Sequence, residues 1–130
     1  MMWKVVFPFL AALLAVGAGG LTGGFQDVDV NDEGAQNALN FAVVQYNRGS
    51  NDVFLSQVAE VVKVQRQVVS GMKYIITAKM AKTQCRKSEV SAIQVCAIHQ
   101  DPEQAQPFHC TFTVWSRSWL DDIRLLKQEC

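Results

Sequence analysis

A single helical pattern precedes a chain that otherwise has the pattern of β-strands, and this order restricts the choice of fold. Asn31-Asp-Glu33 is typical of a helix start, because an Asn side chain caps free amides and carboxylates suit the positive end of a helix. Apolar residues then recur at spacings of three and four, which places them on one helix face: Ala35, Ala38, Leu39, Ala42, Val43 and Tyr46. Phe41 and Val44 flank this stripe, so we expect much of the helix to be covered before Arg48-Gly-Ser-Asn-Asp52 ends it.

The remaining apolar segments predict strands. Val53 to Val68 is rich in valine, and Met72 to Met80 alternates apolar with polar residues, which is the period of a half-buried strand. Three further candidates are Ile93–Cys96, Phe108–Trp115 and Ile123–Lys127. One helix and about five mostly antiparallel strands make an α+β domain, in which the sheet covers the apolar face of the helix.

The start of the chain is typical of a secretory leader. A short positive segment, an uncharged apolar run and small residues predict a signal peptide over residues 1–18, cleaved after Ala18 or Gly19. The alternative is a membrane anchor, but the run is shorter than the roughly 20 residues that span a bilayer. We therefore expect a secreted, extracellular domain over residues 19–130 with no membrane partner. Leu21 to Val30, which is Gly-rich at first, should form an arm that leads into a short extended segment.

Four cysteines follow the leader, and an even count in a secreted chain predicts two disulfides. Four cysteines allow three pairings. The short local closures Cys85–Cys96 and Cys110–Cys130 are the simplest of these.

Several function classes are disfavoured by the composition. Without Lys4 of the leader, eleven basic residues face twelve acidic ones, so no basic face for a nucleic acid is indicated. A metal site is not expected, because no Cys-x-x-Cys or His-x-x-x-His spacing occurs and His99 and His109 are isolated. An enzyme would need a nucleophile with a base in reach, and oxidised cysteines leave no thiol for that role.

Two predicted turns are unusually apolar. Gln67-Val-Val-Ser-Gly71 joins the first two long strands, and Gly71 fits a position that needs positive φ in a bulged hairpin. Spacing alone leaves open whether Val68 and Val69 are exposed or simply continue the strand and pack. Trp115-Ser-Arg-Ser-Trp119 lies between the last two strands, and a Trp on a turn is typical of a contact for a partner. Two such hairpins side by side predict a binding ridge rather than a cleft.

These motifs together resemble the type 2 cystatins, secreted inhibitors of papain-like cysteine proteases. Gln67-Val-Val-Ser-Gly71 matches the Gln-x-Val-x-Gly loop of that family, and Phe41-Ala-Val-Val-Gln-Tyr-Asn47 is similar to its helix signature. Gly23 stands at the N-terminal glycine, and Trp119 stands in the second loop. There Ser118 replaces the family's proline, which should lower affinity modestly, because proline reduces the entropy lost on binding.

The resemblance covers essentially the whole mature chain and implies the cystatin fold, a five-stranded antiparallel sheet wrapped around one long helix. It also implies the disulfides Cys85–Cys96 and Cys110–Cys130. The implied activity is reversible, tight inhibition of papain-like proteases (cathepsins) without cofactor or catalysis, by insertion of an arm and two loops into the active-site cleft. The residues so implied to bind the protease are Leu21, Thr22, Gly23, Gln67, Val68, Val69, Ser70, Gly71, Ser118 and Trp119.

A second site is also implied, because some members of the family inhibit the asparagine-specific protease legumain through a Ser-Asn-Asp segment. Ser50, Asn51 and Asp52 match this segment just after the predicted helix, although Asn51 is equally well explained as a loop residue. The alternative to an inhibitor is a non-inhibitory cystatin-fold binding module, and the retained loop motif stands against it. We expect a monomer, with a domain-swapped dimer as the alternative.

Overall fold

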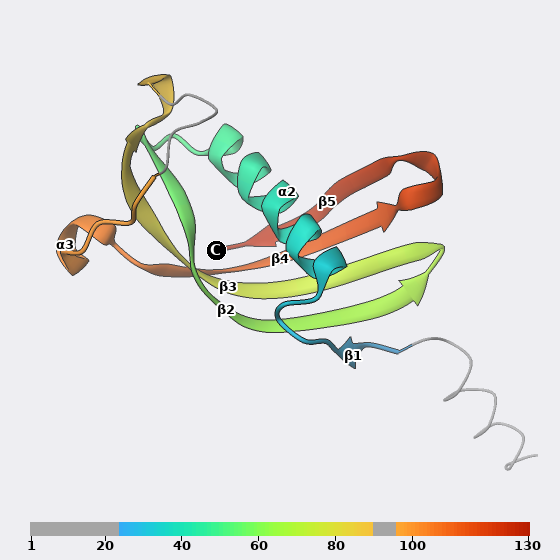
Figure 1. Ribbon diagram of the computed structural model, residues 1–130. Coiled ribbons are helices and arrows are strands. Elements are labelled where there is room, and N and C mark those ends of the chain that lie inside the picture. The colour runs from blue at the N-terminus through green and yellow to red at the C-terminus, as the bar shows by residue number, and fades with distance from the viewer. Residues whose placement is uncertain (1–23, 90–95) are drawn as a thin grey trace, which may run out of the picture.

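A computed structural model describes residues 24–89 and 96–130, in which five antiparallel strands wrap around one long helix, α2 (Figure 1). Each strand pairs with its neighbour in sequence, so the sheet order is β1-β2-β3-β4-β5. The expected α+β class and the five-stranded antiparallel sheet are confirmed. The elements are β1 (Gln26–Asp27), α2 (Glu33–Gly49), β2 (Phe54–Val69), β3 (Gly71–Arg86), the 3-10 turn η1 (Lys87–Glu89), α3 (Pro102–Ala105), β4 (Phe108–Arg117), the 3-10 turn η2 (Ser118–Leu120) and β5 (Asp122–Glu129).

The start of α2 differs by one residue from the prediction. Asp32, not Asn31, is the N-cap, and its carboxylate accepts a hydrogen bond of 3.0 Å from the Ala35 amide. The amide of Asn31 instead donates to the Asp29 carboxylate at 2.8 Å. The capping carboxylate and Glu33 in the first turn both suit the positive end of the helix.

The core lies between one face of α2 and the sheet. The predicted stripe is buried at Ala35, Ala38, Leu39 and Ala42, and it packs with buried sheet residues that include Ile76, Ala78, Phe112 and Val114. Small side chains on the helix let its backbone approach the sheet closely. Val44 is exposed, so the expectation that much of the helix is covered is wrong on that side, because the sheet covers only one face.

Bulges in β2 decide which of its valines face the core. The pairing of β2 with β3 shifts register between Val58 and Glu60 and again between Val61 and Lys63. Because successive strand residues point to opposite faces, each bulge changes the face that the following residues occupy. Val64 is therefore buried while Val62, two residues earlier, is exposed. Simple alternation along the sequence cannot predict this difference.

One predicted strand falls mostly outside the described residues. Of Ile93–Cys96, residues 93–95 lie outside the described residues, and Cys96 belongs to no strand. Within the described residues the fifth strand is β1, which pairs with Gln65 and Arg66 of β2. The strand predicted over Met72–Met80 is also longer than expected and continues as β3 to Arg86. The predicted leader, residues 1–18, and Leu21–Gly23 lie outside the described residues. None of the helices described is long and apolar enough to cross a membrane.

Two disulfides are present, Cys85–Cys96 and Cys110–Cys130, the pairing that the resemblance implies. Cys85–Cys96 links the end of β3 to the segment that contains Ile98, which forms an isolated antiparallel β-bridge with Thr83. Cys110–Cys130 ties β4 to the residue that follows β5, which is the mostly exposed edge strand.

Replacing Cys110 and Cys130 by alanine should lower the free energy of unfolding by about 3 kcal/mol, because the disulfide restricts the unfolded chain. It should cost more than the same change at Cys85 and Cys96, since the bridged residues are 20 apart rather than 11 and the longer loop loses more entropy on closure. Urea denaturation of both variants checks this. Equal midpoints for the wild type and the Cys110/Cys130 variant would contradict it.

Candidate functional site

Two hairpin tips lie side by side at one end of the molecule (Figure 1). The first tip, Gln67–Gly71, joins β2 to β3, and the second tip, Ser118–Asp121, joins β4 to β5. They are neighbours because β3 pairs with β4, with Met72 opposite Ser116. The sequence made Trp115 both the last residue of a predicted strand and the first of the turn. The structure places it within β4, which continues to Arg117, so the turn begins at Ser118.

Both tips expose large apolar side chains. Val68 and Val69 are the last two residues of β2, so they do continue the strand. They are 56% and 39% exposed, however, and therefore do not pack into the core. Trp119 is 62% exposed, and the adjacent Leu120 is 55% exposed. Sequence reasoning missed Leu120, although its position beside Trp119 in a turn was a usable signal. We call these four side chains the apolar ridge; an exposed cluster of this kind is typical of a protein-binding surface.

Backbone geometry fixes the shape of each tip. Gly71 has φ +99°, which confirms the positive φ predicted for it, and a Cβ there would collide with the Ser116 carbonyl oxygen. Asp121 closes the second tip with φ +52° and donates its amide to the Ser118 carbonyl oxygen at 3.1 Å. The first tip thus requires glycine both for its own turn and for the close approach of the second hairpin.

The described part of the chain begins near the same end. β1 lies beside β2, where Gln26 pairs with Arg66, the residue before the first tip. Leu21, Thr22 and Gly23, which the resemblance assigns to the same surface, lie outside the described residues.

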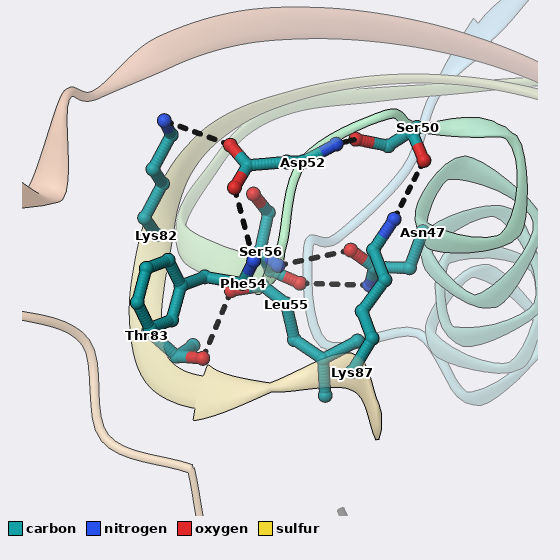
Figure 2. A network of polar contacts seen from close by, with 9 residues as sticks. All are labelled: Asn47, Ser50, Asp52, Phe54, Leu55, Ser56, Lys82, Thr83 and Lys87. Carbon is teal, nitrogen blue, oxygen red and sulfur yellow. Dashed lines mark hydrogen bonds and ion pairs between the residues drawn. The ribbon is translucent and has the colours of Figure 1, made fainter. Parts of the chain in front are cut away.

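The Ser50-Asn51-Asp52 segment lies at the opposite end of the molecule, in the loop from α2 to β2 (Figure 1). Figure 2 shows that both neighbours of Asn51 are held by hydrogen bonds. The Asp52 carboxylate accepts from the Phe54 amide at 2.9 Å and pairs with Lys82 Nζ at 2.7 Å. The Ser50 carbonyl oxygen accepts from Lys87 Nζ at 2.7 Å, while Asn51 itself is exposed. The loop therefore presents Asn51 between two fixed residues.

Hydrogen bonds between the end of α2 and the start of β2 also stabilise this loop. Asn47 bonds twice to the backbone of Ser56, donating to its carbonyl at 3.0 Å and accepting from its amide at 2.9 Å. The hydrogen bond from Lys82, followed by that from the Phe54 amide, holds the pKa of the Asp52 carboxyl below its usual value. Asp52 thus remains ionised, and the loop contact intact, as the pH falls towards the ordinary carboxyl range. The sequence did not indicate this network, because Lys82 and Lys87 lie thirty or more residues from Ser50 and Asp52.

The predicted site residues that the structure describes form two separate groups, as the two implied sites require. The hairpin residues gather at one end and Ser50–Asp52 at the other. Among the described residues no group of three or more His, Cys, Asp or Glu side chains could hold a metal ion.

Comparison with known proteins identifies a family. A family model of the Cystatin domain matches residues 23–119. Cystatin-C of Paralichthys olivaceus is 59% identical over 129 residues, which cover 99% of this chain and all of that protein. Cystatin-C of Bos taurus is 40% identical over 112 residues, or 86% of this chain and 75% of that protein.

Solved structures agree with the architecture. The structure of Al-CPI has a TM-score of 0.69 and 30% identity, covering 82% of this chain and 98% of that one. The structure of dimeric human cystatin F has a TM-score of 0.77 at 23% identity, covering 88% of this chain and 91% of that one, a likeness of fold alone.

Gly71→Ala should lower the free energy of unfolding by about 2 kcal/mol, because alanine at positive φ is strained and its Cβ meets the backbone of Ser116. Gly49→Ala is the matched control, since a Cβ at Gly49, the last helical residue, meets nothing within 4 Å. Urea denaturation of the two variants gives both values. A Gly71 variant as stable as the control would show that the tip tolerates a side chain.

Proposed function

Because this chain belongs to the cystatin family of cysteine protease inhibitors, we propose that it is a secreted, tight-binding and reversible inhibitor of papain-like proteases. The observation that carries this proposal is the apolar ridge, with Val68, Val69, Trp119 and Leu120 exposed on two adjacent tips. The active-site cleft of such a protease accepts extended chains and is apolar, so the ridge gains about 25 cal/mol per Å² of apolar surface that it buries there, before the costs of association.

The inhibitory surface has three parts in this proposal. The first tip and the Ser118-Trp119 tip enter the cleft together, and Leu21-Thr-Gly23 extends along it as an arm. The pairing of Gln26 with Arg66 supports this, because it brings the chain that follows the arm alongside the first tip. Signal-peptide removal after residue 18 would leave the arm at the start of the mature domain, residues 19–130. The two disulfides fit the oxidising compartments of the secretory route.

Inhibition is reversible because the tips offer no peptide bond for attack. The carbonyl oxygen of Ser70 accepts a hydrogen bond of 2.8 Å from the Trp115 indole nitrogen. A carbonyl committed to this bond inside a tight turn is not presented as the carbonyl of an extended substrate. The inhibitor therefore fills the cleft without being cleaved, and one chain supplies both tips, so a monomer suffices.

Ser118 in place of the family's proline changes affinity rather than mode. The second tip is already closed by the hydrogen bond from the Asp121 amide to the Ser118 carbonyl oxygen. Proline would also have fixed φ before binding, so its absence adds a modest entropic cost. Trp119, rather than the residue at position 118, remains the larger apolar contact of this tip.

A second inhibitory function is favoured by the fixed Asn51 loop. We infer that Asn51 binds the specificity pocket of a legumain-like protease. Ser50 and Asp52 are both held, so the loop would lose little freedom on binding. The distance between the two ends of the fold leaves room for both proteases at once.

Trp119→Ala should weaken papain inhibition about thirtyfold, since truncation of an aromatic contact at an interface costs about 2 kcal/mol. Leu126→Ala is the control, because Leu126 is also exposed but lies in β5 beyond the tips. Titration of active papain measures both. Activity should return on dilution, with the inhibitor intact on a gel. Cleavage at Ser70–Gly71 without inhibition would refute the proposal.

Asn51→Lys should abolish legumain inhibition and leave papain inhibition unchanged, because a pocket built to bind an amide rejects groups that lack it. Trp119→Ala should weaken papain inhibition and leave legumain inhibition unchanged. Parallel titrations of each variant against both proteases test this, and a ternary complex should appear in size-exclusion chromatography. Coupled losses in the two variants would eliminate the two-site model.

A further inference from the structure

A chain of side-chain contacts joins the two hairpin tips. Trp115 of β4 donates its indole N–H to the carbonyl oxygen of Ser70 in the first tip, 2.8 Å away. The guanidinium of Arg117 lies 4.3 Å from the centre of the Trp115 ring, a cation–π distance. Arg117 in turn donates from Nε, at 3.1 Å, and from Nη2 to the carboxylate of Asp122 at the start of β5.

The tips are not supported by the core. A groove of about 480 Å³ separates them from the start of α2, and its lining includes Val68 and Trp119 as well as Gly34 and Ala38 of the helix region. Ser70 also lies beyond Met72–Ser116, the last residue pair at this end of the β3–β4 ladder. Beyond the ladder, the close approach of Gly71 to the Ser116 carbonyl and the hydrogen bond of the Trp115 side chain fix the first tip relative to the second.

We propose that Trp115 and Arg117 are positioning residues, which form a clasp that holds the two tips as one preformed ridge. This rests on the proposed inhibitory function and deepens it. A ridge fixed in advance loses less conformational freedom when it enters a cleft, so the clasp adds affinity without contacting the protease. Trp115 is suited to this role because its flat ring offers Arg117 a face while its N–H reaches Ser70.

Asp122 keeps the clasp closed in acid. The hydrogen bond from Arg117 is the largest of the effects that hold the pKa of the Asp122 carboxyl below its usual value, and Arg124, which donates to Oδ1 at 3.3 Å, adds to it. A lowered pKa means that the ion pair is present above the ordinary carboxyl range and is lost only as the pH falls through the lowered value. The clasp therefore remains closed in mildly acidic surroundings.

Trp115→Phe tests the clasp directly, because it removes the N–H donor and keeps an aromatic face for Arg117. We expect lower NMR order parameters for the amides of residues 68–71 in the free protein. Papain affinity should fall about fivefold, the equivalent of about 1 kcal/mol for one hydrogen bond. Lys127→Gln is the matched control and should change neither quantity, since Lys127 is an exposed basic residue of β5 that lies opposite Thr113 and pairs with Glu129, away from the clasp.

Asp122→Asn provides a second variant that leaves the Trp115 ring intact, in case Trp115→Phe lowers overall stability. It should loosen the same amides, and combined with Trp115→Phe it should add little, because the residues act as one unit. Unchanged order parameters in both variants would overturn the clasp, as would looser tips with unchanged papain affinity. If the wild type does not inhibit papain at all, the proposed function fails, while the order parameters still decide whether the clasp holds the tips.

Discussion

Burial of the alanine face of α2 in the sheet is the contact on which the rest of the structure depends. Ala35, Ala38 and Ala42 allow the sheet to curve closely around the helix. At 1.5 Å per residue, the 17 residues of α2 span about 25 Å, whereas the 16 residues of β2 and of β3 each span about 53 Å at 3.3 Å per residue. The strands therefore extend past the helix, and their ends project beyond the core.

These projecting ends explain why the two candidate sites are so different in construction. At the hairpin end, apolar side chains remain exposed because the helix does not reach them, and local devices such as the positive φ of Gly71 and the bond from Trp115 fix their position. At the other end the chain turns from α2 into β2, and polar contacts from Lys82 and Lys87 fix the loop instead. An exposed apolar ridge is suited to the apolar cleft of a protease, and an Asn side chain on a fixed loop is suited to a specificity pocket.

One hydrogen bond has two consequences for the proposed inhibitor. The bond from Trp115 to the carbonyl oxygen of Ser70 draws the first tip towards the second hairpin. It also engages the carbonyl that a protease would attack if the tip were bound as a substrate. Rigidity and resistance to cleavage thus arise from the same contact in this interpretation, which is how a surface made for a protease cleft avoids becoming its substrate.

The sequence alone determined the features that depend on neighbouring residues. The helix stripe, the positive φ at Gly71, the two apolar tips and the family motifs all follow from short spacings, and the α+β class follows from their order. Tertiary structure decided what depends on distant residues: the bulges that expose Val62 and bury Val64, the choice of β1 as the fifth strand, and the exposure of Val68 and Val69. Trp115 and Ser70 are 45 residues apart, so no local pattern could pair them. Strand register and long-range hydrogen bonds are set by how the whole sheet closes around the helix, and that closure is not encoded in any single segment.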